Sequence, residues 1–232
     1  LTLDELSDGE IKKIIDLAIK LKKNNRRGKD KPLLKNKTLA MIFEKPSTRT
    51  RTSFDVGVRQ LGGQPMLLSG TEMHLGKGET ISDTARVLSR YVDLIMLRTF
   101  ESQTLYEMAK HSTVPVINGL TNESHPCQIM ADIMTFEEKK GSIKGKKVVW
   151  FGDSNNVFNS FLQAAEKFNF SLIFSGPKEL DPPKNLIKNA KNLKIDFKID
   201  RDPISAIKDA INGLNKRKYK NMKVRCFVTI TS

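Results

Sequence analysis

Short apolar runs and amphipathic segments alternate along most of the chain. After an amphipathic helix predicted at residues 4–22, apolar runs predict strands at residues 37–43, 65–68, 94–97 and 114–117. Apolar side chains at helical spacing predict helices at residues 47–61, 80–91, 103–111 and 126–139. Strands that alternate with helices in this way are typical of an α/β fold with a mostly parallel sheet.

The pattern pauses and then begins again in the second half. Residues 137–142 are polar and end in Gly-Ser, which indicates a domain boundary. Beyond it, strands are predicted at residues 147–151, 171–174 and 195–199, and a helix at residues 156–168. We therefore predict two doubly wound α/β domains with parallel sheets, residues 1–136 and 137–232. Residues 211–232 form an atypical tail, in which apolar residues show no clear periodicity before a short apolar run at residues 226–230.

Composition narrows the possible settings and partners. The 232 residues contain no apolar run near the roughly 20 residues of a membrane span. No signal peptide is evident, and the two cysteines are far apart, which favours a reduced cytoplasm and no membrane partner. The net charge of +14 raises the possibility of a nucleic-acid-binding module. Because the lysines are scattered and not interleaved with aromatic residues, we rank that possibility last and expect no nucleic-acid partner.

A run of hydroxyl and guanidinium side chains stands where the first predicted strand passes into a helix. Ser47 is a good N-cap, and Pro46 lies just before it. The residues from Ser47 to Arg51 therefore occupy the first turn of the helix, where free backbone N–H groups and the positive end of the helix dipole favour an anion. The run predicts a phosphate site. The alternative is a capped helix whose basic side chains point into solvent.

Residues 43–54 resemble the carbamoyl-phosphate loop of the aspartate/ornithine carbamoyltransferase family. Further matches to this family follow in its order and cover residues 1 to about 210. They are a glycine-rich loop with the following helix (residues 76–86), Leu97-Arg98-Thr99 at a strand end, residues 118–121, His125-Pro126-Cys127-Gln128, and residues 152–160. Several matches in order are far more specific than one motif alone.

The resemblance implies a role for each matching residue in holding carbamoyl phosphate. Arg98, His125 and Thr50 would stabilise the oxyanion at the carbonyl carbon. Gln128 would accept a hydrogen bond from the carbamoyl amide. His74 would reach the substrate from a neighbouring subunit, which implies a homotrimer with shared sites. The residues that match the phosphate ligands are Ser47, Thr48, Arg49 and Thr50.

Catalysis of this kind needs positioning and charge stabilisation and no covalent intermediate. No serine lies in a nucleophile elbow, and no acidic residue stands near His125 in sequence to build a triad. Cys127 is therefore interpreted as a packing residue. A structural or solvent-exposed histidine remains the alternative for His125.

The motifs resemble the ornithine branch of the family. The aspartate branch typically has Asn-Ala-Gly-Asp-Gly before its His-Pro pair, whereas this chain has Asn118-Gly119-Leu120-Thr121. This resemblance implies transfer of a carbamoyl group to ornithine, with citrulline and phosphate as products, in cytoplasmic arginine biosynthesis and without a metal or cofactor. Asn156 would bind ornithine, although a helix N-cap is an alternative role. Putrescine, an acylated ornithine and aspartate remain alternative amines.

Two later family segments, Asp-x-x-x-Ser-Met and His-Cys-Leu-Pro, have no counterpart in the chain. The sequence therefore resembles a C-terminally truncated member whose second domain is incomplete. We expect such a chain to bind carbamoyl phosphate but to turn over ornithine poorly. A non-catalytic chain that only binds carbamoyl phosphate is the corresponding alternative.

Overall fold

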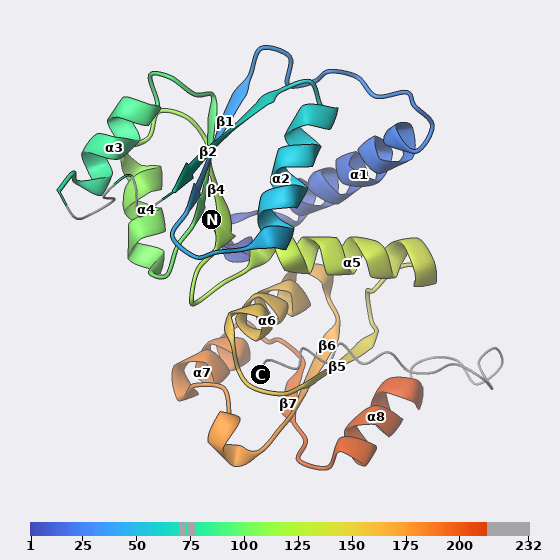
Figure 1. The fold of residues 1–232 in the computed structure, drawn as a ribbon. Coiled ribbons are helices and arrows are strands. Elements are labelled where there is room, and N and C mark those ends of the chain that lie inside the picture. The colour runs from blue at the N-terminus through green and yellow to red at the C-terminus, as the bar shows by residue number, and fades with distance from the viewer. Residues whose placement is uncertain (70–72, 74–77, 213–232) are drawn as a thin grey trace.

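The computed structural model describes residues 1–69, 73 and 78–212 and contains two layered α/β units (Figure 1). The first unit is built on strands β1 to β4 and the second on strands β5 to β7, with helix α5 running between the two sheets. Within the described residues, no helix is long and apolar enough to cross a membrane.

The first sheet has four parallel strands in the order β2-β1-β3-β4 within the described part of the chain. The strands are β1 (Thr38–Phe43), β2 (Gln64–Ser69), β3 (Leu94–Arg98) and β4 (Val116–Leu120). The helices of this unit are α1 (Asp8–Asn25), α2 (Thr48–Gln60), α3 (Ile81–Leu88), α4 (Ser102–His111) and α5 (Pro126–Lys140), preceded by the short 3₁₀ helix η1 (Leu3–Glu5).

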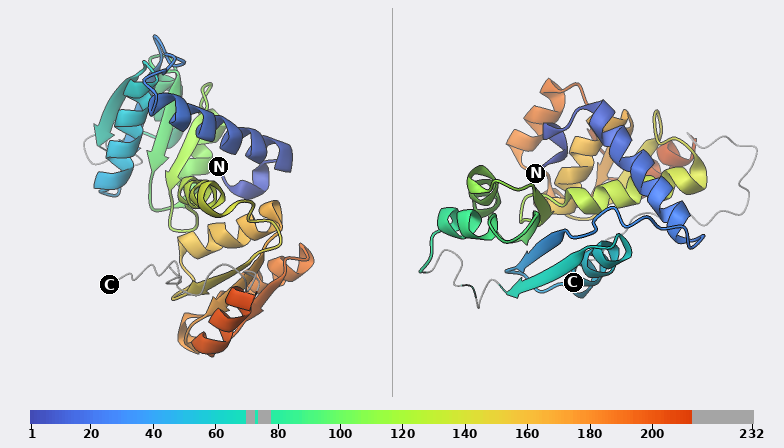
Figure 2. Two further views of the ribbon diagram at one scale, coloured as in Figure 1. Left: turned by 90° about the vertical axis from the view of Figure 1, so that its right-hand side faces the viewer. Right: turned by 90° about the horizontal axis from the view of Figure 1, so that it is seen from above.

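Strand β1 is buried on both faces, which explains its unbroken apolar sequence. Leu39 and Met41 share a core cluster with Val58 of α2. Ala40 and Ile42 point to the opposite face and share a second cluster with residues of α3 and α4. Helices therefore cover both faces of the sheet (Figure 2), as the predicted doubly wound fold requires.

The second sheet has three parallel strands in the order β5-β6-β7 among the described residues. The strands are β5 (Lys147–Phe151), β6 (Ser171–Ser175) and β7 (Phe197–Ile199), and the helices are η2 (Lys178–Leu180), α6 (Asn156–Phe168), α7 (Lys184–Asn192) and α8 (Pro203–Asn212).

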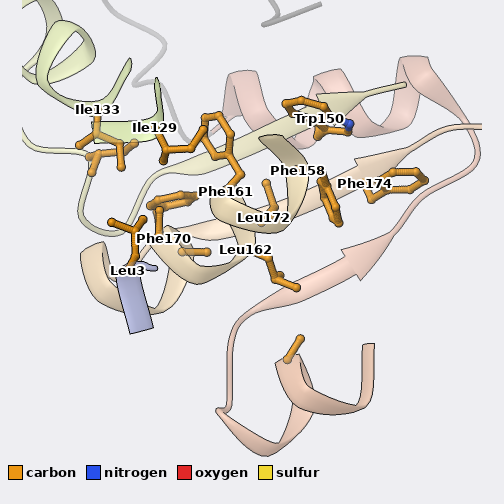
Figure 3. Close-up of a cluster of buried hydrophobic side chains, with 14 residues drawn as sticks. Leu3, Ile129, Ile133, Trp150, Phe158, Phe161, Leu162, Phe170, Leu172 and Phe174 are labelled. Atoms are coloured by element: carbon orange, nitrogen blue, oxygen red, sulfur yellow. The ribbon is translucent and has the colours of Figure 1, made fainter. Parts of the chain in front are cut away.

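Aromatic side chains pack with aliphatic ones in the core of the second unit (Figure 3). The rings of Phe158 and Phe174 meet edge to face, with centroids 5.1 Å apart. Leu3 near the N-terminus and two isoleucines of α5, Ile129 and Ile133, belong to the same cluster. The first part of the chain therefore contributes side chains to the core beneath α6.

The predicted two-domain α/β fold with parallel sheets is confirmed, and most predicted elements are found within a few residues. The helix predicted at residues 4–22 is interrupted, because Ser7 starts α1 with a capping box to Glu10. Helices α7 and α8 were not predicted, and the apolar run at residues 226–230 lies outside the described residues. Helix α5 runs through the boundary predicted between residues 136 and 137, and that boundary stays a prediction.

Candidate active site

The loop after β1 leads into the first turn of α2. Ser47 is the N-cap of this helix, and its hydroxyl accepts a hydrogen bond from the Thr50 backbone N–H at 3.3 Å. Thr48 and Arg49 are exposed on the same turn, which contains no acidic residue. The helix N-terminus therefore offers free N–H groups, hydroxyls and a positive side chain to an anion.

A cavity of about 530 Å³ adjoins this turn. Ser47, Thr48 and Arg51 contribute hydroxyl and guanidinium groups to its wall, and Leu67 and Leu68 of β2 contribute apolar side chains. The phosphate loop is thus open to a space large enough for a small ligand.

Arg98 ends β3, directly beside β1, where its register partner is Phe43. The pairing of β3 with β4 shifts between Leu97 and Arg98, an irregularity that can redirect a side chain at the end of a strand. One guanidinium nitrogen, Nη1, lies 3.4 Å from the Thr50 hydroxyl. Burial lowers the pKa of Arg98, and its Nε is buried with no hydrogen-bond partner among the described residues.

Glu44 fastens the phosphate loop to the end of β3. Its backbone N–H donates to the Arg98 carbonyl at 2.9 Å, and its carboxylate accepts a hydrogen bond from the Thr99 hydroxyl. The loop is therefore held beside Arg98 by backbone and side-chain contacts. Sequence reasoning did not single out Glu44.

His125 immediately precedes α5 and is largely buried. Burial, and secondarily the positive charge of Arg98, lower the pKa of its imidazole from 6.5 to about 4. The ring is therefore neutral near pH 7, with one nitrogen as donor and the other as acceptor. Its Nδ1 is buried and lacks a hydrogen-bond partner within the described residues.

Gln128 lies one helical turn after His125 and is exposed. Its side-chain Nε2 donates to Asp132 Oδ1 at 2.9 Å. A carboxylate only accepts, so this contact directs the amide nitrogen toward Asp132 and leaves Oε1 available elsewhere. Asp132 was missed at the sequence level, although an acid four residues after the glutamine was a readable signal.

Asn156 is the first residue of α6, and its Nδ2 donates to the Thr121 carbonyl at 2.7 Å. The N-cap role considered for Asn156 is wrong, because Asn155 is the N-cap and accepts from the N–H groups of Val157 and Phe158. The amide oxygen of Asn156 is not used by the helix end.

Cys127 lies against the backbone, with its Sγ 3.4 Å from the Asn118 carbonyl. Burial raises the pKa of its thiol to about 11, so that the unreactive thiol form prevails at neutral pH. This environment suits the packing role expected for Cys127. His74 lies outside the described residues.

The predicted phosphate turn, Arg98 and His125 meet at the carboxyl end of the first sheet. The chain leaves β1 toward β2 on one side, while β3 lies on the other side of β1, and such a switch point is where open α/β sheets bind ligands. Parallel strands bring the three segments together from positions far apart in the sequence. No group of three or more His, Cys, Asp or Glu side chains is placed to hold a metal ion within the described residues.

Two family models match consecutive parts of the chain. The carbamoyl-P binding domain of aspartate/ornithine carbamoyltransferase matches residues 1–138, and its Asp/Orn binding domain matches residues 144–212.

Similar proteins agree with these matches. Ornithine carbamoyltransferase of Roseobacter denitrificans is 58% identical over 207 residues, which are 87% of this chain and 67% of the relative. The enzyme of the same name from Cereibacter sphaeroides is 56% identical over 216 residues, or 90% of this chain and 70% of the relative. The solved ornithine carbamoyltransferase of Pyrococcus furiosus has a TM-score of 0.85 at 47% identity and covers 90% of this chain and 68% of its own.

The chain thus spans about two thirds of the length of these relatives. The two family models together match almost all of its described residues, in the order in which the two units occur. The chain belongs to the aspartate/ornithine carbamoyltransferase family.

Proposed function

We propose that the chain is an ornithine carbamoyltransferase, which moves the carbamoyl group of carbamoyl phosphate to the side-chain amine of L-ornithine and yields L-citrulline and phosphate. One observation carries this proposal. Arg98 Nε and His125 Nδ1 are both buried and have no hydrogen-bond partner among the described residues. They lie beside a helix N-terminus suited to phosphate. The relatives named ornithine carbamoyltransferase support the choice of reaction.

The phosphate group of carbamoyl phosphate would rest on the first turn of α2. Backbone N–H groups there, with the side chains of Ser47, Thr48, Arg49 and Thr50, supply donors to its oxygens. Holding the dianion at a fixed point also orients the carbonyl carbon for attack.

Arg98 and His125 would bind the carbonyl oxygen, assisted by the Thr50 hydroxyl. The neutral amine forms a bond to the carbonyl carbon, the oxygen gains negative charge, and the bond from carbon to the phosphate oxygen then breaks. The nitrogen loses one proton during this exchange, and the leaving phosphate takes it up. A neutral His125 donates a hydrogen bond to the oxyanion without giving up its proton, and Arg98 supplies positive charge.

Two amides would orient the reacting groups. With its nitrogen engaged by Asp132, Gln128 can present Oε1 to the carbamoyl NH₂ group. Asn156 would bind ornithine from the start of α6, while its bond to the Thr121 carbonyl fixes the side chain.

We further propose the setting that the family resemblance implies. The active unit is a homotrimer in which His74 reaches the carbamoyl phosphate of a neighbouring subunit, and it acts in cytoplasmic arginine biosynthesis. Residues 1–136 would form the carbamoyl-phosphate-binding domain, and residues 137–232 part of the ornithine-binding domain. Sedimentation equilibrium of the chain at several concentrations tests the trimer, and a monomeric mass would contradict it.

An assay with varied amines tests the proposed reaction. Ornithine, putrescine, N-acetylornithine and aspartate are each incubated with the chain and labelled carbamoyl phosphate, and the carbamoylated products are separated. We expect measurable product with ornithine alone. Product with another amine would replace ornithine as the proposed substrate. Binding of carbamoyl phosphate with no product from any amine would favour a non-catalytic binding chain.

A further inference from the structure

We propose that Ser160 is a positioning residue that holds His125 in place from the second unit of the fold. The proposal deepens the proposed function and rests on it for the catalytic role of His125. The Ser160 hydroxyl accepts a hydrogen bond from the His125 backbone N–H at 2.8 Å, although the two residues are 35 positions apart in sequence.

One face of α6 makes three contacts with the segment that leads into His125. Asn156, Asn159 and Ser160 are spaced so that they lie on the same side of the helix. Asn156 donates to the Thr121 carbonyl at 2.7 Å, and Asn159 donates to the Glu123 carbonyl at 3.1 Å. With the bond from His125 to Ser160, alternate residues of this segment are joined to α6.

Ser160 lies in a dry environment. Its exposed fraction is 0%, and its neighbours Phe158 and Phe161 belong to the aromatic core shown in Figure 3. A partly buried N–H that loses the one acceptor it has among the described residues is costly, so the position of the His125 backbone depends on this hydroxyl.

The side chains of the segment before His125 are held within the first unit, although two of its backbone carbonyls bind α6. The Ser102 hydroxyl donates to the Thr121 hydroxyl at 3.0 Å, and Asn118 Nδ2 donates to the Ser124 hydroxyl at 2.9 Å, both within the first unit. At His125 the backbone N–H bonds to the second unit as well. Because His125 makes no side-chain capping bond and its Nδ1 has no described partner, its backbone determines where the imidazole lies.

Helix α6 therefore connects the two halves of the proposed reaction. Its first residue, Asn156, is the proposed ornithine ligand, and Ser160 one turn later places the histidine that would bind the carbamoyl oxygen. A single rigid helix can hold the amine and the carbonyl group at a fixed position relative to each other. Loss of the hydroxyl should release His125 from its buried place beside Arg98.

Ser160→Ala removes the acceptor, and Ser175→Ala is the matched control. Ser175 is another buried serine of the second unit, and its hydroxyl has no hydrogen-bond partner among the described residues. NMR titration of the imidazole signals, with His125 assigned through His125→Gln, reports the place of the ring without any need for activity. Calorimetry with carbamoyl phosphate reports the site as a whole.

In Ser160→Ala we expect the pKa of His125 to rise from about 4 toward 6.5 and the affinity for carbamoyl phosphate to fall at least tenfold. Ser175→Ala should change neither quantity. An unchanged His125 pKa in Ser160→Ala would overturn the positioning role. If Ser160→Ala fails to fold, Ser160→Cys keeps the size with a weak acceptor, and the same pKa criterion applies to it.

The two measurements separate this inference from the proposed function. If the unmodified chain binds no carbamoyl phosphate but Ser160→Ala still raises the pKa of His125, the proposed function fails and the positioning role stands. If carbamoyl phosphate binds and the pKa of His125 is the same in both chains, the proposed function stands and the positioning role fails.

Discussion

His125 illustrates how its surroundings alter a single side chain. Its ordinary pKa would leave part of the population charged near neutral pH, yet burial and the nearby Arg98 lower the value to about 4. The motif around His125 was readable from the sequence, but its pKa was not. Burial depends on the packing of α5 against α6, and the approach of Arg98 depends on the pairing of β3 with β4.

This lowered pKa predicts a pH-dependent stability. Below pH 6.5 the unfolded chain binds a proton at His125, whereas the folded chain binds it only near pH 4. The free energy of unfolding should therefore fall as the pH drops from 6.5 to 4, by about 3 kcal/mol from this group. Urea unfolding at a series of pH values measures the effect.

A variant pair identifies the group responsible. His125→Gln should flatten the decrease over this pH range, and His111→Gln, at the end of α4, should keep it. An equal decrease in His125→Gln and the unmodified chain would contradict the buried, neutral histidine.

At the scale of elements, strong local signals predicted the fold well. Helix α6 spans residues 156–168 as expected, because an Asn cap and an amphipathic pattern both mark it. Helix α7 was missed, since Lys and Asn residues dilute its apolar stripe, and α8 was missed although most of it precedes the atypical tail at residues 211–232. The contacts of α6 with the segment around His125 were not predictable, because they join residues about 35 positions apart.

The N-terminus of α2 allows capping and anion binding to be separated. Ser47→Asp keeps a side-chain acceptor at the N-cap, and a negative charge suits the helix dipole there. We expect the free energy of unfolding to stay within about 0.5 kcal/mol of its original value, while binding of carbamoyl phosphate is lost through charge repulsion.

Ser47→Ala is the complementary variant. It removes the cap and should lower the free energy of unfolding by about 1 kcal/mol, with a smaller loss of affinity because no negative charge is introduced. Chemical denaturation and calorimetry together measure both quantities. Strong binding of carbamoyl phosphate by Ser47→Asp would show that the anion lies elsewhere.

At the scale of the whole molecule, the two units contribute unequally to the proposed site. Every described residue proposed to bind carbamoyl phosphate comes from the first unit or from α5, whereas the amine side is represented by Asn156 of the second. The order of motifs predicted such a division, and two separate family models match residues 1–138 and 144–212. How His74 enters the site was not predictable from one chain, since the resemblance places it in a neighbouring subunit.

A polypeptide of these 232 residues should bind carbamoyl phosphate but form citrulline slowly. It aligns with 67% of the relative from Roseobacter denitrificans and lacks two family segments named above. Because the loss of one transition-state contact costs roughly a hundredfold, we expect its turnover to be at least about a hundredfold below that of the relative. Parallel citrulline assays compare the two, and similar rates would show that the described residues suffice.

Calorimetric titration with carbamoyl phosphate tests the central claim most directly, because it asks whether the turn at the start of α2 is an anion site. Arg49→Ala should weaken binding by on the order of 2–4 kcal/mol, since it removes a charge-assisted contact to a dianion. Arg59→Ala, at the other end of α2 and paired with Asp55, should leave the affinity unchanged. Equal affinities in the unmodified chain and Arg49→Ala, or no binding by the unmodified chain, would contradict the account.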